Sequence, residues 1–156
     1  MNKLTSYAIG ETGPAGGKVF YSTDGGLHGL EVAPEDQISA PWGCDGTRIN
    51  GADGTTVGTG AQNTVDILAC CTDTEIAASC AATYEVNGFD DWFLPSKGEL
   101  DLLYQEKAIV SVFADPYYWS STEYDGKLAW FQSFSNGLHY VDFRIDALRV
   151  RAVRAF

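Results

Sequence analysis

Segments with strand character lie at both ends of this chain, and short segments with helix character lie between them. Near the N-terminus, Lys18–Ser22 and Leu27–Ala33 are rich in β-branched and aromatic residues and flank an Asp-Gly-Gly turn signal, which predicts a hairpin. Toward the other end, Arg149–Arg154 has a period-two strand pattern. This order predicts the α+β class, with the N- and C-terminal strands adjacent in a small antiparallel sheet.

Three short helices are predicted between these strands. The first covers Ala61–Cys71, and the other two begin at capping boxes, which pair Thr72 with Glu75 and Ser96 with Glu99. The second helix is expected to end at the Asn-Gly pair 87–88. The residues expected to point inward are Ala61, Val65, Leu68 and Ala69 in the first helix, Ile76, Cys80 and Tyr84 in the second, and Leu100, Leu103 and Tyr104 in the third.

The segment Glu35–Thr59 is rich in glycine and aspartate and has only a weak period, so it is predicted to be a long loop. A loop of this length in a compact domain is usually functional or held by a cross-link. Asp45, Asn50 and Asp53 each precede a glycine, which favours ordinary turns. A calcium site is the alternative, although the spacing differs from that of an EF-hand. No other cofactor is expected.

The four cysteines, Cys44, Cys70, Cys71 and Cys80, lack the paired spacing of a zinc site. They allow three full pairings, among which the sequence does not choose. One or two disulfides in a protein that acts outside the cell is the favoured interpretation. Buried free thiols are the alternative.

The length and charge of the chain exclude several classes of protein. Its 156 residues fit one domain, expected over residues 7–156 after a disordered or linker lead-in at residues 1–6. A formal net charge of −11 argues against nucleic acid and anionic lipid as partners. No apolar run is long enough to span a bilayer, so no membrane insertion is expected. Because Met1–Tyr7 lacks the apolar core of a signal peptide, export by another route, a trimmed start and an intracellular location all stay open.

Catalytic patterns are absent from the sequence, and we expect no enzyme. His28 and His139 have no partner at a recognisable spacing, and no nucleophile-elbow or phosphate-loop motif occurs. Asp90 and Asp91 are adjacent, so on a strand they would point to opposite faces. A structural role such as pairing with a C-terminal arginine is the favoured interpretation for them.

The last third of the chain, Tyr118–Phe156, alternates between strand-like framework and unpatterned segments. Trp119, Trp130 and Phe134 are predicted core residues, whereas Phe131, Ser133 and Ser135 should share an exposed face. The run 138–148 has neither strand nor helix period. Its Tyr140, Phe143 and Arg144, set among small and acidic residues, resemble the aromatic and arginine anchors of a binding surface.

Several motifs, in order, carry a resemblance to a known family over nearly the whole chain from Tyr7. They are IGETGPAGGKVFY, DGGLHGLEVAPEDQ, PWGCDGT, GTGAQNT, DDWFLPSKGELDLLY, YWSSTEY, AW and VRAVRAF. Together they resemble the Lcl C-terminal domain-like family, found at the end of bacterial collagen-like adhesins. The resemblance implies a C-type-lectin-like fold of short helices packed on a small antiparallel sheet with long loops.

Members similar to this chain include variable proteins of diversity-generating retroelements, in which selected codons are rewritten at adenines. That resemblance implies a ligand-binding variable region over about 118–156. The implied variable residues are Tyr124, Asp125, Gly126, Leu128, Phe131, Ser133, Ser135, Asn136, Leu138, Tyr140, Val141, Asp142, Phe143, Ile145, Asp146, Ala147 and Leu148. Randomising the adenines of an AAC codon never yields Lys, Glu, Gln, Met or Trp, and the run 138–148 contains none of them. Lys127 lies outside that set, and His139 and Arg144 stand where the resemblance implies Gln and Lys.

The resemblance therefore implies a non-enzymatic domain that binds a protein or glycan ligand through a hypervariable surface. It would act outside the cell, on a cell surface or a phage particle. A fixed adhesin domain that binds glycans or matrix polymers, with a homo-oligomer as one form, is the first alternative. An enzyme related by fold to formylglycine-generating enzymes is the second. The sequence does not identify the ligand.

Overall fold

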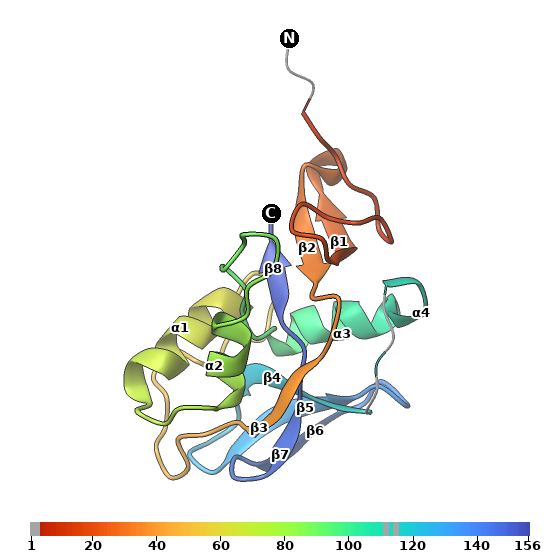
Figure 1. Cartoon of the computed structure of the whole chain (residues 1–156). Helices are drawn as coiled ribbons and strands as arrows, with labels where there is room; N and C mark the ends of the chain where they lie inside the picture. Colours follow the sequence, from red (N-terminus) through yellow and green to blue (C-terminus); the bar gives the residue numbers. More distant parts are fainter. Residues whose placement is uncertain (1–3, 111–112, 114–115) are drawn as a thin grey trace.

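The predicted N-terminal hairpin lies beside the end of the chain in the computed structural model, which describes residues 4–110, 113 and 116–156 (Figure 1). β1 (Lys18–Thr23) and β2 (His28–Val32) pair antiparallel around the short 3-10 helix η1 (Asp24–Gly26). β2 also pairs antiparallel with β8 (Val153–Ala155). The prediction that the terminal segments meet in an antiparallel sheet is confirmed.

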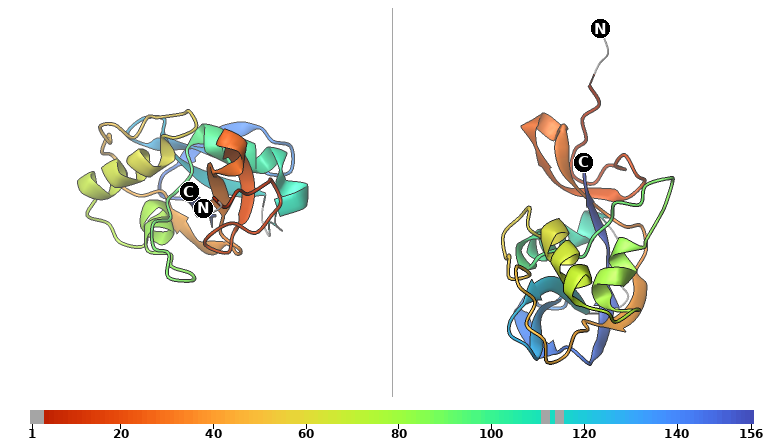
Figure 2. Two further views of the ribbon diagram at one scale, coloured as in Figure 1. Left: turned by 90° about the horizontal axis from the view of Figure 1, so that it is seen from above. Right: turned by 90° about the vertical axis from the view of Figure 1, so that its left-hand side faces the viewer.

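A second sheet has five strands in the order β3-β7-β4-β5-β6. Its strands are β3 (Gln37–Pro41), β4 (Tyr117–Glu123), β5 (Leu128–Ser133), β6 (His139–Phe143) and β7 (Ala147–Val150). The neighbours pair antiparallel except β4 and β7, which are parallel. Figures 1 and 2 show this sheet at the opposite end of the molecule from β1 and β2.

The helices lie between the two sheets (Figure 1). They are α1 (Gly60–Cys70), α2 (Ala77–Ala82), α3 (Lys97–Gln105) and α4 (Lys107–Val110). Short helices packed on a small sheet, with the N- and C-terminal strands adjacent, form an α+β architecture consistent with the C-type-lectin-like fold.

β3 corrects the prediction of one continuous loop over Glu35–Thr59. Among the strands that the structure describes, it is terminal and pairs only with β7, with a register shift between Gln37 and Ala40. Its Ile38 side chain is 68% exposed. An edge strand with an exposed apolar residue does not show the alternation that reveals a half-buried strand, which is why the pattern missed it.

The buried face of α1 is the opposite of the predicted one. Ala61, Val65, Leu68 and Ala69 are all exposed, whereas Asn63, Thr64 and Ile67 are buried. The Asn63 side chain accepts the Gly54 N–H and donates to the Gly54 carbonyl, at 3.2 and 2.8 Å. Buried polar groups that are fully hydrogen-bonded can replace an apolar stripe, and hydrophobic periodicity does not detect them.

α2 begins later and ends earlier than predicted. Ile76, not Thr72, precedes its first turn, and the Ser79 hydroxyl accepts the Ile76 N–H at 3.0 Å. Ile76 is buried, while Cys80 and Tyr84 are only half-buried. Asn87 and Gly88 both have positive φ and form a turn between the bridged residues Val86 and Phe89, so they lie beyond the helix.

The capping box of α3 is confirmed. The Ser96 hydroxyl accepts the Glu99 N–H at 3.3 Å, and the Glu99 carboxylate accepts the Ser96 N–H at 2.8 Å. The same carboxylate accepts the Gly58 N–H at 3.0 Å and so holds the end of the long loop. Leu100 and Leu103 are buried as predicted, while Tyr104 is half-buried.

Arginines of the last segment connect the sheets to the rest of the fold. Arg154 lies 3.2 Å from the buried Glu31 carboxylate and 2.5 Å from that of Asp91. Arg151 lies 2.7 Å from Asp36. The interpretation that the Asp90–Asp91 pair serves a C-terminal arginine is confirmed for Asp91.

Candidate ligand-binding surface

Buried and exposed residues occupy separate blocks in the last third of the chain. Tyr118–Glu123 are buried, as are Ala129, Gln132 and Val150–Arg154. The implied variable residues differ from this framework, because all except Ser133 are at least partly exposed. The fully exposed ones are Tyr124, Ser135, Asn136, Leu138, Tyr140, Phe143, Ile145, Asp146 and Ala147, and the partly exposed ones are Asp125, Gly126, Leu128, Phe131, Val141, Asp142 and Leu148.

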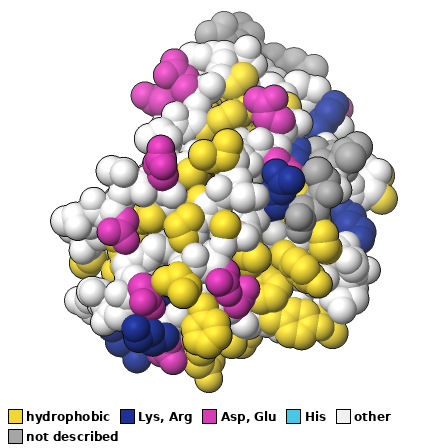
Figure 3. Space-filling model, turned by 60° about the horizontal axis from the view of Figure 1, so that its bottom comes forward, with side chains coloured by type: hydrophobic (Ala, Val, Ile, Leu, Met, Phe, Trp, Pro, Cys, Tyr) yellow, Lys and Arg dark blue, Asp and Glu magenta, His cyan; other side chains and the backbone are white. Residues whose placement is uncertain are grey.

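A row of aromatic rings crosses three neighbouring strands on one face of the five-stranded sheet. Phe131 on β5 lies between Tyr117 on β4 and Tyr140 on β6, with ring centroids 5.5 and 5.6 Å away. Tyr117 is 45% exposed and Tyr140 is 42% exposed. We call Tyr117, Phe131 and Tyr140 the aromatic row. Turning the sheet end of the molecule forward shows hydrophobic side chains gathered there (Figure 3).

The strand register divides the implied variable residues between two faces. Phe131 opposes Tyr140, whereas Leu128 opposes Phe143 on the other face. Trp130 also lies on that second face, half-buried, with Lys97 Nζ 3.7 Å above its ring and the Tyr124 ring 5.5 Å away. Predicted residues of β5 and β6 therefore lie on both faces of the hairpin. β6 is the terminal strand of the sheet, so it forms the edge between these two faces.

Two predictions about burial on β5 are wrong. Trp130 is not a core residue, because it is only half-buried and lies beneath Lys97. Ser133 is only 3% exposed. Its Oγ accepts the Ser135 N–H and its carbonyl accepts the Gly137 N–H, so the turn after β5 folds over this small side chain.

Arg144 is a structural residue, which corrects its interpretation as a binding anchor. Its guanidinium is fully buried, 3.2 Å from the Glu123 carboxylate and 4.4 Å from the centre of the Trp42 ring. It donates to the carbonyls of Cys44 and Thr47, at 3.2 and 2.7 Å, and to that of Asp125. One side chain therefore connects three loops beneath the exposed residues on either side of it.

Two other positions within this region also have structural partners. His139 is half-buried with Nε2 3.5 Å from the Asp101 carboxylate, and burial, with the nearby Lys97 charge, lowers the pKa of its imidazole. Asp125 accepts the N–H groups of Lys127 and Leu128, both at 2.8 Å. The Lys127 N–H is the main cause that lowers the pKa of the Asp125 carboxyl. These contacts shape the turn that presents Tyr124.

One of the aspartates considered for calcium has another partner. Asp45 lies 3.3 Å from Lys127 Nζ. Within the described ranges, the only cluster of three metal-ligating side chains contains Cys44, Cys71 and Asp73, and its two thiols are joined to each other. Asp45 and Asp53 belong to no such cluster within these ranges.

The cysteines form one disulfide, between Cys44 and Cys71, whose Cα atoms are 5.6 Å apart. It ties the loop after β3 to the end of α1. Cys70 and Cys80 are free thiols. The prediction of one or two disulfides is confirmed, and a disulfide is typical of proteins that function in oxidising compartments.

The fold and this surface define a C-type-lectin-like domain with exposed aromatic side chains on its larger sheet. Residues 45–154 match the Lcl C-terminal domain, and the chain belongs to that family. The family points to a binding domain of the adhesin type. Comparison with curated proteins found no match. No helix within the described ranges is long and apolar enough to cross a membrane.

Tyr117 is the residue of the aromatic row that the sequence interpretation did not single out. It precedes the YWSST framework, and period two from the buried Trp119 places it on the same face as Phe131. The strand period was therefore the signal that would have identified it.

Proposed function

We propose that this domain binds a ligand directly through the aromatic row and the exposed residues around it. The single observation that carries the proposal is the aromatic row, in which the exposed Tyr117 and Tyr140 flank the partly exposed Phe131 on one face of the sheet. Aromatic side chains on a fixed backbone provide a large contact area at a low cost in conformational entropy, and they are enriched among residues that dominate binding. The ligand is a protein or a glycan on another cell or surface.

The proposal includes diversification of this surface by a retroelement. It is supported by the separation of the last third into a buried framework and exposed positions, because exposed side chains can change with little effect on stability. It is also supported by Arg144, whose burial explains why a fixed residue stands among positions proposed to vary.

The proposed role is non-enzymatic, and the proposed location is outside the cell, on a cell surface or phage particle. The Cys44–Cys71 disulfide supports that location, and it also leaves these two cysteines without the free thiols that a cysteine-dependent reaction needs. A fixed adhesin domain that binds glycans, as a monomer or a homo-oligomer, is the alternative within the same family.

The binding proposal is tested with arrays of purified glycans and purified surface proteins. The Phe131→Ser/Tyr140→Ser variant removes two members of the row. A matched control, Val57→Ser/Val65→Ser, removes two exposed apolar side chains elsewhere. We expect the row variant to bind any target of the native domain at least about tenfold more weakly, since buried aromatic contacts are worth 2 kcal/mol or more, while the control keeps its affinity.

Equal loss of affinity in both variants, or none in the row variant, would contradict binding through the row. Adding a chelator distinguishes direct binding through the aromatic row from calcium-dependent binding by a fixed adhesin domain. Glycan binding that is abolished by the chelator and unchanged by the row variant would instead favour a fixed, calcium-dependent adhesin.

A further inference from the structure

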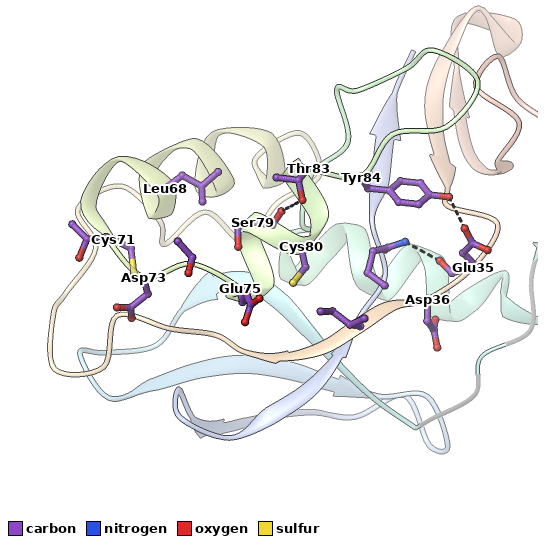
Figure 4. Close-up of a pocket in the computed structure, with 14 residues that line it drawn as sticks. Glu35, Asp36, Leu68, Cys71, Asp73, Glu75, Ser79, Cys80, Thr83 and Tyr84 are labelled. Carbon is purple, nitrogen blue, oxygen red and sulfur yellow. Dashed lines mark hydrogen bonds between the residues drawn. The ribbon is translucent and has the colours of Figure 1, made fainter.

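A groove of about 850 Å³ lies between β3 and the helices α1 and α2 (Figure 4). β3 is the terminal strand at the opposite edge of the sheet from β6, so this groove is separate from the β5–β6 hairpin. It is lined by residues of β3, the α1–α2 connection and α2. We propose that the groove binds a polypeptide segment that carries lysine or arginine next to apolar side chains.

The lining of the groove is negatively charged. It contains the carboxylates of Glu35, Asp36, Asp73 and Glu75, and none of the described residues that line it is a lysine, arginine or histidine. Arg151 balances Asp36 at 2.7 Å. No cation within the described part of the chain lies within ion-pair distance of the other three carboxylates. Complementarity therefore requires a cationic ligand.

The same groove has an apolar part. Ile38 is 68% exposed beside it, and Leu68 on α1 and the half-buried Tyr84 ring also line it. Figure 4 shows Leu68 above the groove and Tyr84 at one end, where its hydroxyl donates to the Glu35 carboxylate at 3.3 Å. Apolar side chains in a concave site gain from being covered, so the ligand must also provide apolar groups.

The combination of carboxylates and apolar side chains favours a basic peptide over a metal ion, nucleic acid or lipid as the ligand of the groove. Among the lining residues, Cys71 and Asp73 belong to a cluster of metal-ligating side chains, but the Cys71 sulfur is bonded to Cys44, which disfavours a metal ion. Uncompensated carboxylates repel nucleic acid and anionic lipid headgroups. An extended segment can place its basic side chains on separated carboxylates and its apolar side chains on Ile38 and Leu68.

The two free thiols allow peptide binding in the groove to be measured by their rates of chemical labelling. Cys80 lines the groove and is half-buried, whereas Cys70 is exposed and does not line it. Burial, with the charge of Glu75, raises the pKa of the Cys80 thiol, so alkylation is followed at mildly alkaline pH. The probe is a short peptide of alternating leucine and lysine, and its control is the same peptide with glutamate in place of lysine. Maleimide labelling of each thiol is measured by mass spectrometry.

We expect the lysine peptide to slow labelling of Cys80 at least about fivefold, to leave Cys70 unchanged, and to lose its effect at high salt, because exposed charge pairs are screened. The glutamate peptide should protect neither thiol. Protection of Cys80 by neither peptide, or by both equally, would overturn the proposal.

A pair of double variants with equal net charge tests the role of the carboxylates. Glu35→Gln/Glu75→Gln removes two charges from the groove, and Asp53→Asn/Asp90→Asn removes two exposed charges elsewhere. We expect the groove variant to need about tenfold more lysine peptide for half-protection of Cys80, since every 1.4 kcal/mol is tenfold in affinity, and the control variant to match the native domain. Identical behaviour of both variants would show that only the overall charge of the protein attracts the peptide. Neither result affects the proposed function of the aromatic row.

Discussion

Replacing Arg144 with alanine is expected to lower the free energy of unfolding by about 3–5 kcal/mol, the usual cost of removing one partner from a buried ion pair. The substitution leaves the Glu123 carboxylate buried without the partner that lies 3.2 Å away. It also removes the cation stacked on Trp42 and the donors to three loop carbonyls. Arg48, exposed and 3.4 Å from Glu123, compensates only in part, because solvent-exposed cations contribute little.

Chemical denaturation of Arg144→Ala and of its neighbour Ile145→Ala measures this effect. Ile145 is exposed, so its variant should unfold within about 0.5 kcal/mol of the native domain. Arg144→Lys keeps the charge but not the planar set of donors, and an intermediate stability is expected. An Arg144→Ala variant as stable as Ile145→Ala would contradict the structural role of this arginine.

The Cys71→Ser variant is expected to lose about 3–4 kcal/mol of stability. The Cys44–Cys71 disulfide has a sequence separation of 27 residues, and closing a loop of that length restricts the unfolded chain by about this amount. The disulfide also anchors the loop whose Cys44 carbonyl accepts from Arg144. Loss of the disulfide should therefore also weaken the loops that Arg144 connects.

Cys70→Ser is the matched control, because Cys70 is adjacent in sequence but is an exposed free thiol. We expect Cys70→Ser to have the same free energy of unfolding as the native domain. A reductant should lower the stability of Cys70→Ser and of the native domain by the same amount. A reductant that has no effect on unfolding, or a Cys70→Ser variant as unstable as Cys71→Ser, would contradict the observed pairing.

Local signals predicted the elements that depend on local interactions. The Asp-Gly-Gly turn marked the hairpin of β1 and β2, and the Ser96–Glu99 capping box marked the start of α3. Both depend on residues within a few positions of one another, which a single sequence displays. The resemblance to the family, carried by long motifs, supplied the arrangement that local patterns do not determine.

The errors at α1 and Arg144 share one physical cause, which is burial of polar groups through distant contacts. Thr64 lies on the buried face of α1 because its hydroxyl donates to the Leu94 carbonyl and accepts the Leu94 N–H, thirty positions away. Arg144 is buried because its guanidinium pairs with the Glu123 carboxylate and stacks on the Trp42 ring. Hydrophobic patterning assigns such residues to the surface, since their partners are not visible in the local sequence.

The sequence predicted which residues belong to the candidate surface better than it predicted the face of the sheet on which each one lies. Alternation along β5 correctly separated Phe131 from Gln132, which is buried. It failed at Ser133, where the strand ends in a turn. It also did not reveal that Leu128 and Phe143 share one face while Phe131 and Tyr140 share the other, because the pairing register of β6 depends on the tertiary fold.

The most direct test of the central proposal is nucleotide sequencing of the gene and its flanking DNA. Diversification predicts a second copy of the segment that encodes residues 118–156, differing from the first only where the second copy has adenine. The differing codons should encode exposed residues such as Tyr124, Tyr140 and Ile145, and the codons for the buried Trp119 and Gln132 should agree. Absence of a second copy, or differences that ignore adenines and fall on buried residues, would contradict diversification, and a fixed binding surface would replace it.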